Sequence, residues 1–195
     1  MGHPVLHLAR VLGAAVNHPL PLLLRQGVGH LALQVKVFLA ADLKRAAELV
    51  CSAGQCGIGH TRWATHGKPE ERNAHPHLDG PGQVAVVQNG IIENYTEIKA
   101  EPHADGYEFT SDTDTDTEVI VHLIHQQRKN RPNLFSAVQQ GTRRLVGAYA
   151  IAVLREHDNR TIVVRHGAPL LIGVADNACY AASDASALLQ VTRNI

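Results

Sequence analysis

The sequence has 195 residues, which suits one domain, since domains commonly contain about 100–200 residues. Lysine and arginine total 18, as do aspartate and glutamate, and this balance argues against a polyanionic partner such as nucleic acid. The three cysteines, Cys51, Cys56 and Cys179, lack the number and spacing of a secreted disulfide framework. We therefore expect a cytoplasmic protein with a small polar ligand.

The first 35 residues show no sustained period of 3.6 or 2, so the sequence assigns no secondary structure to them. The apolar run Val11–Val16 is interrupted by Asn17–Pro19, which argues against a secretory signal. The longer run from Pro19 to Ala41 contains Arg25, His30 and Lys36. It falls short of a membrane span of about 20 apolar residues, and we expect no membrane partner.

Apolar side chains recur at steps of three and four over residues 36–50, which predicts a short helix there. Val84–Gln88 is a short apolar run and predicts a strand. A second helix is predicted behind Asp116 and Thr117, which are candidate N-terminal caps, because apolar residues return at helical spacing after them.

A third helix is predicted over Leu134–Val146, with Asn133 as its N-cap. Five strands are predicted after it: Tyr149–Arg155, Thr161–Arg165, Leu170–Val174, Cys179–Ala182 and Leu188–Thr192. The connections between them are short, which favours antiparallel neighbours. The predicted fold class is therefore α+β, with helices covering a mainly antiparallel sheet.

Three polar clusters could carry chemistry: His60–Gly67, Asn89–Asn94 and Ser111–Glu118. Each also has a purely structural interpretation. Asn89–Gly90 between apolar runs is typical of a type I′ hairpin turn. Arg62 next to Trp63 could be a surface cation beside an aromatic ring, and the alternating Asp and Thr residues could be a solvated loop that caps the next helix.

Metal binding is disfavoured by spacing. A calcium loop beginning at Asp112, with Asp114 and Asp116, would need Gly at its sixth position and Glu at its twelfth, where the chain has Thr117 and Leu123. A zinc site also lacks a second cysteine pair or a paired histidine spacing. Its incomplete candidate ligands are Cys51, Cys56, His75 and His77. We expect neither a metal nor a cofactor.

Five segments taken together identify a protein family much more specifically than any one of them alone. They are His60–Gly67, Asn73–His77, Gln88–Asn94, Asp114–Val119 and Leu145–Tyr149. In order and spacing they resemble the class II glutamine amidotransferase domains, in the form found in glutamine–fructose-6-phosphate transaminases. The resemblance is close over residues 57–195, loose over residues 36–56 and lacking over residues 1–35. We accordingly expect an amidotransferase domain over residues 36–195, preceded by an unmatched segment.

The resemblance implies a four-layer αββα fold of the N-terminal-nucleophile hydrolase type, incomplete at its N-terminus. It further implies a domain that releases ammonia from L-glutamine for the synthesis of glucosamine 6-phosphate from fructose 6-phosphate. Nothing in the sequence resembles a sugar-phosphate isomerase domain, so the acceptor site would belong to another chain.

The same resemblance assigns roles to individual residues. Asn89, through its side-chain amide, and Gly90, through its backbone N–H, match the pair that holds the oxyanion of the tetrahedral intermediate. Arg62 matches the residue that binds the α-carboxylate of glutamine, and Asp116 matches the acid that receives the α-ammonium. Asp114 competes for the latter role because the Asp-Thr repeat holds one extra unit.

Three further residues of the first cluster are assigned to the pocket by resemblance. Thr65 and His66 match residues that line it, and Trp63 matches a residue on a mobile lid. The resemblance also implies a helix after Asn94, and Pro102 is expected to shorten it because proline has no N–H to donate.

The family's nucleophile is an N-terminal cysteine whose free α-amine acts as the base. This chain begins Met1-Gly2-His3, and Cys56, although followed by Gly57 and Ile58 as in the family's opening tripeptide, has no free amine. We expect Cys56 to be a small buried hydrophobe and the chain to be inactive. The alternatives are a non-catalytic glutamine-binding module, a fragment, or the glutaminase domain of another amidotransferase.

Overall fold

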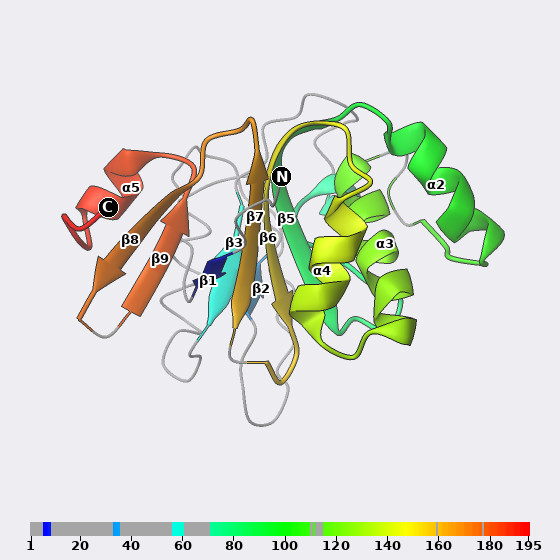
Figure 1. Ribbon diagram of the computed structural model, residues 1–195, viewed down its shortest axis with the longest axis horizontal. Helices are drawn as coiled ribbons and strands as arrows, with labels where there is room; N and C mark the ends of the chain where they lie inside the picture. The colour runs from blue at the N-terminus through cyan, green and yellow to red at the C-terminus, as the bar shows by residue number, and fades with distance from the viewer. Residues whose placement is uncertain are drawn as a thin grey trace.

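The computed structural model describes part of the chain, namely residues 6–8, 33–35, 56–60, 71–109, 111, 115–158, 160–176 and 178–195. Figure 1 gives the arrangement of their helices and strands. The helix predicted over residues 36–50 lies outside the described residues, and so does Asp114.

One five-stranded sheet forms the centre of the described structure, in the order β1-β7-β6-β5-β4. Its strands are β1 (Leu6–Leu8), β7 (Thr161–His166), β6 (Gly147–Arg155), β5 (Val84–Ile92) and β4 (His77–Leu78). Every neighbouring pair is antiparallel. The prediction of an α+β class with a mainly antiparallel sheet is thus confirmed. β1 lies where the sequence assigned no element, because backbone pairing with β7 does not require a side-chain pattern.

The first part of strand β5, residues 84–88, is buried on both faces of the sheet. Successive side chains of a strand point to opposite sides. Val84 and Val86 belong to one hydrophobic core, and Ala85 and Val87 belong to a second core on the other face. The continuous apolar run that predicted a strand therefore reflects a sheet that lies between two packed layers.

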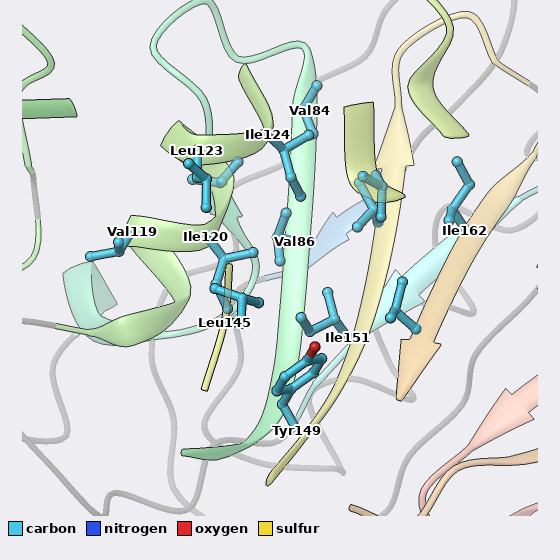
Figure 2. Packing of buried hydrophobic residues seen from close by; sticks show 14 of the residues in the cluster. Val84, Val86, Val119, Ile120, Leu123, Ile124, Leu145, Tyr149, Ile151 and Ile162 are labelled. Atoms are coloured by element: carbon cyan, nitrogen blue, oxygen red, sulfur yellow. The ribbon is translucent and has the colours of Figure 1, made fainter. Parts of the chain in front are cut away.

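Helices α3 (Asp116–Asn130) and α4 (Leu134–Thr142) cover the first face, and α2 (Tyr95–Ala104) packs against α3. Figure 2 shows Ile120 and Ile124 of α3 facing Val86 and Val84 of β5, and it places Ile151 and Tyr149 of β6 in the same core. The predicted N-cap Asn133 is confirmed, since its Oδ1 accepts a hydrogen bond of 2.9 Å from the Phe135 N–H.

The second face is covered by short strands. β2 (Leu33–Val35) and β3 (Gly57–Gly59) pair in parallel, and β8 (Leu171–Ala175) and β9 (Ala178–Ala182) pair antiparallel. Helix α5 (Ala185–Leu189) packs on the outside of β8 and β9 (Figure 1). The layers are thus helices, sheet, strands and helix, the αββα arrangement. A single 3-10 turn, η1 (Glu71–Asn73), precedes β4.

Two predicted elements differ from the structure near the C-terminus. The predicted strand Leu188–Thr192 is the end of helix α5 and the turn that follows it, because Asp184 caps that helix by accepting from the Ser186 N–H at 2.7 Å. The N–H groups of Val191 and Thr192 then both donate to the Leu188 carbonyl. A strand is impossible with this local bonding.

Two helix ends also differ. The helix predicted over Leu134–Val146 stops at Thr142, and residues 147–155 enter strand β6. Pro102 does not shorten helix α2, which continues to Ala104. Pro102 lies in the last turn of that helix. Its missing N–H removes one backbone hydrogen bond there, and the helix still continues for two residues.

Candidate functional site

The structure describes three of the seven residues assigned to the site from sequence: Asn89, Gly90 and Asp116. The other four, Arg62, Trp63, Thr65 and His66, lie within residues 61–70, outside the described residues. The three that are described come together at one end of the central sheet, because Asn89 and Gly90 belong to β5 and Asp116 bonds to that strand.

Asn89 and Gly90 do not form a hairpin turn, so that alternative is wrong. Both lie inside β5, opposite Ala150 and Tyr149 of β6. Gly90 has a φ of +104°, and a Cβ placed on it would lie 2.0 Å from the Ala148 carbonyl oxygen. The residue must be glycine because the neighbouring backbone approaches too closely for a side chain.

A second glycine repeats this geometry on the partner strand. Gly147, opposite Ile92, has a φ of +123°, and a Cβ there would lie 2.3 Å from the Ile91 carbonyl oxygen. The two strands are therefore closely apposed where β5 ends and β6 begins. Gly90 itself is exposed, so its backbone is open to a ligand on the side away from β6.

The Asn89 side chain is oriented by a histidine. The Nε2 atom of His60 lies 2.5 Å from the Asn89 Oδ1. A carboxamide oxygen only accepts, so the imidazole N–H donates, and the Asn89 Nδ2 group is turned away from His60. An amide fixed in this way presents its N–H donors in one direction, as an oxyanion-binding group requires.

Asp116 is the first residue of helix α3, with Thr115 in the N-cap position. Its Oδ2 accepts hydrogen bonds of 2.9 Å from the Ile92 N–H and from Gln88 Nε2, and its Oδ1 accepts one of 3.0 Å from the Thr117 N–H. A carboxylate is also favoured at a helix N-terminus by the direction of the peptide dipoles.

Four polar residues to which the sequence analysis gave no part in the glutamine site lie next to it: His60, His75, Gln88 and Thr117. The Thr117 hydroxyl lies 2.6 Å from Gln88 Oε1 and 2.9 Å from His75 Nε2. The rings of His60 and His75 lie 4.4 Å apart between centroids. All four residues stand within the matched segments, but the contacts between segments cannot be read from sequence.

Asn94 fixes the loop that leads into β6. Its Nδ2 donates to the Arg144 carbonyl, and its Oδ1 accepts from the Val146 N–H, each at 2.9 Å. Arg144 in turn forms a two-bond ion pair with Glu101 of α2, and its hydrogen bond is the main cause that lowers the pKa of the Glu101 carboxyl. This double attachment holds the start of β6 against the end of β5.

Cys56 precedes β3 and packs, partly buried, against the second core. The expectation of a small buried hydrophobe is thus met only in part, since the side chain packs on the core but is not fully buried. Within the described ranges, no group of three or more His, Cys, Asp or Glu side chains is placed to hold a metal ion. Among the same residues, no helix has the length and apolar character needed to cross a membrane.

A family model described as a glutamine amidotransferase domain matches residues 60–190. Curated relatives agree with it. The chain is 48% identical over 176 residues to a glutamine–fructose-6-phosphate aminotransferase (isomerizing) of Acidithiobacillus ferridurans, which covers 87% of this chain and 28% of the relative. A protein of the same name from Aquifex aeolicus is 51% identical over 140 residues, covering 71% and 23%. The chain thus spans about a quarter of these relatives.

A solved structure is similar as well. It is the glutamine phosphoribosylpyrophosphate amidotransferase of B. subtilis in complex with ADP and GMP, with a TM-score of 0.63 and 30% sequence identity. The match covers 79% of this chain and 33% of that one. Its fold agrees with the layers described above.

Proposed function

Because this chain belongs to the class II glutamine amidotransferase domains, in the form found in glutamine–fructose-6-phosphate aminotransferases, we propose that residues 36–195 bind L-glutamine as a glutaminase domain. The observation that carries the proposal is the meeting of Asn89, Gly90 and Asp116 at one end of β5. This arrangement supports the assignment of two oxyanion donors and of an acid for the α-ammonium, although Asp116 lies on α3 and is distant in sequence.

Each matched residue then has a physical task. Asn89 Nδ2 and the Gly90 N–H stabilise the negative oxygen of the tetrahedral intermediate, and loss of one such donor typically costs about 10²–10³ in rate. Arg62 binds the α-carboxylate through its planar fork. Asp116 receives the α-ammonium.

The remaining assignments complete the pocket. Thr65 and His66 line it, and Trp63 covers it. The acceptor reaction, formation of glucosamine 6-phosphate from fructose 6-phosphate with the ammonia, needs a sugar-phosphate acceptor domain, and we propose that residues 36–195 are the glutaminase part that serves such a domain. We also place the protein in the cytoplasm, where both substrates are metabolites.

Turnover requires a thiol beside a free α-amine. Cys56 is bonded within the chain next to β3, so it carries no free α-amine. We therefore propose that residues 36–195 bind glutamine and that Cys56 does not hydrolyse it. A non-catalytic glutamine-binding module and an active glutaminase domain share this fold. The two differ in one observable, the release of ammonia.

The test measures binding and turnover on the same sample. L-glutamine should raise the melting temperature, since a ligand that binds only the folded state stabilises it. No ammonia should be released above background. Arg62→Ala should abolish the shift, because removal of one partner of a desolvated charged contact commonly costs about 2–5 kcal/mol. Arg143→Ala, at an exposed position after α4, is the control and should leave the shift unchanged.

Two outcomes would contradict the proposal. A melting temperature that does not respond to L-glutamine at any soluble concentration would remove the binding function. Ammonia release that disappears in Cys56→Ser would restore the enzyme and assign the nucleophile to Cys56.

A further inference from the structure

The Asp116 carboxylate is held at one end of β5 by donors on both of its oxygens. β4 pairs with β5 only at Ala85 and Val86, so its ladder stops well before Ile92. Beyond the end of this ladder, the Ile92 N–H donates a hydrogen bond to Asp116 Oδ2. Gln88 Nε2 donates a second hydrogen bond to the same oxygen. Asp116 Oδ1 receives one bond, from the Thr117 N–H. The two oxygens are therefore not equivalent.

Gln88 is 3% exposed, and the direction of its amide is fixed by its partners. A carboxylate only accepts, so Nε2 must face Asp116. Oε1 then faces the Thr117 hydroxyl, which donates to it at 2.6 Å. Thr117 is completely buried, and because its single hydrogen is committed to Gln88, its oxygen accepts from His75 Nε2 at 2.9 Å.

These bonds form a directed chain from His75 through Thr117 and Gln88 to Asp116. Each donor points towards the carboxylate, so each bond polarises the next and strengthens the last one. The chain stabilises one rotamer of Asp116. It also leaves Oδ1 as the oxygen with an unused lone pair, since a carboxylate oxygen accepts about two hydrogen bonds.

We propose that Gln88 is a positioning residue for substrate recognition: it anchors Asp116 through Oδ2, so that Oδ1 faces the α-ammonium of glutamine. The inference rests on the proposed function and deepens it. It concerns selectivity for a ligand that carries an α-ammonium, whereas a residue with a merely structural role would alter the binding of every ligand alike.

The test compares two ligands that differ only in the α-amino group: L-glutamine and glutaramate, which is glutamine without that group. Dissociation constants are measured on the full chain by calorimetry or, for weak binding, by ligand-observed NMR. Gln88→Leu should weaken L-glutamine binding about tenfold or more, the size expected when a hydrogen bond to a charged group is lost. Glutaramate binding should change by less than about twofold, since that ligand does not use Asp116.

Thr117→Val provides a second variant. This variant keeps Gln88 but removes the hydroxyl that fixes the Gln88 amide. It should also weaken the binding of L-glutamine and not of glutaramate, by a smaller factor than Gln88→Leu. Gln83→Leu is the matched control, because Gln83 is exposed just before β5. It should leave both dissociation constants unchanged. If circular dichroism shows that Gln88→Leu does not fold, the comparison is made with Thr117→Val.

Several results would overturn the inference. Equal weakening of both ligands by Gln88→Leu would assign Gln88 a structural role only, and unchanged L-glutamine binding in a folded variant would remove it from the site. A wild-type chain that binds glutaramate and L-glutamine equally would show that Asp116 does not receive the ammonium. A wild-type chain that binds neither would instead overturn the proposed function itself.

Discussion

Gly90 shows how much of this site depends on the absence of a single side chain. The left-handed φ of +104° and the 2.0 Å approach of the Ala148 oxygen both exclude a Cβ. The Asn-Gly pair that normally indicates a turn is used here within a strand, at a place where two backbones nearly touch. Glycine supplies the positive φ in a hairpin turn and in this strand alike. Whether the pair forms a turn or part of a strand depends on its pairing with the neighbouring strand β6.

Gly90→Ala should therefore lower the free energy of unfolding by at least about 2 kcal/mol, because a strained φ alone costs about 1–3 kcal/mol and the backbone contact adds to it. Urea denaturation measures the change. Gly80→Ala is the control: nothing lies within 4 Å of a Cβ there, and its φ is not positive. Its effect should stay within about 0.5 kcal/mol. Equal stability of the two variants would contradict the strain argument.

His122 is a second residue whose surroundings determine its chemistry. It is 3% exposed on α3, between the rings of Tyr107 and Phe109. Burial lowers the pKa of its imidazole below the ordinary 6.5, because the charged form loses its hydration. Glu118, 3.9 Å from Nε2, acts in the opposite direction, as does Asp79, whereas His125 lowers the pKa further.

The sign of the resulting pH dependence follows from that depressed pKa. The unfolded chain binds a proton near pH 6.5 and the folded chain only at lower pH, so protonation below about 6.5 favours unfolding. The free energy of unfolding should fall as the pH drops below this value and level off below the folded pKa. His122→Leu should remove this part of the dependence in denaturation curves between about pH 5 and 8.

His157→Leu, at a side chain that is 61% exposed, is the matched control for this pH series and should keep the wild-type dependence. An unchanged slope in His122→Leu would show that burial of this imidazole does not contribute to acid sensitivity.

At the scale of elements, α3 is joined to the turn between β4 and β5 by one buried carboxylate. Asp79 Oδ1 accepts from the N–H groups of Gln83 and Val84, at 2.6 and 2.9 Å. Its Oδ2 lies 2.7 Å from His125 Nδ1 and 3.6 Å from Arg128 Nη1, both on the helix. A single side chain thus shapes the turn and anchors the helix.

Asp79→Asn keeps one accepting oxygen but turns an N–H₂ group towards His125 and Arg128. Removal of one partner of a buried ion pair costs about 3–5 kcal/mol. Because asparagine keeps one accepting oxygen, we expect Asp79→Asn to lower the free energy of unfolding by a smaller amount, about 2–3 kcal/mol. Asp105→Asn, which affects an exposed hydrogen bond to Gln126, should change stability by less than about 1 kcal/mol. A similar cost for both variants would mean that the buried cluster does not anchor α3.

The same scale shows what the sequence could predict. β6, β7, β8 and β9 were recognised because each is a short apolar run bounded by turn residues. Leu188–Thr192 has the same composition, yet a cap at Asp184 makes its first residues helical. Five or six residues carry too little periodicity to distinguish the two outcomes. β1 was missed because the first 35 residues show no sustained period of 2 or 3.6.

The site divides in a similar way. Asn89, Gly90 and Asp116 are assigned to the site because motif order reports family membership, and their roles stay a prediction. Gln88 was not, since its role arises from a contact between residues 28 positions apart. The bond from His75 to Thr117 spans 42 positions. No local pattern encodes such contacts, and only the paired strands and the helix packed on them bring these groups together.

At the scale of the whole molecule, the central sheet separates two cores. Val153 and Leu154 are neighbours on β6, and they are 0% and 2% exposed, yet Val153 packs beneath the helices and Leu154 beneath the second strand layer. A sheet with one solvent-facing side would have exposed one of the two.

Val153→Ala and Leu154→Ala should each reduce the free energy of unfolding by about 2 kcal/mol or more, because each leaves a cavity in a packed core. Val146→Ala, at a side chain that is 53% exposed, should remain within about 0.5 kcal/mol. Chemical denaturation of the three variants makes the comparison. A silent Leu154→Ala would indicate that the second layer does not pack on the sheet in solution.

The pairing of β1 with β7 has a consequence for the behaviour of the protein in a crowded solution. An uncovered edge strand offers its N–H and C=O groups to any other chain and can seed aggregation. Leu6–Leu8 pairs with Thr161–Val163, so the edge of the sheet there is the three-residue strand β1 rather than these residues of the longer β7. Proteolytic removal of residues 1–8 would uncover a buried, β-branched segment, Ile162–Val164, and turn this edge into a template for polymerisation.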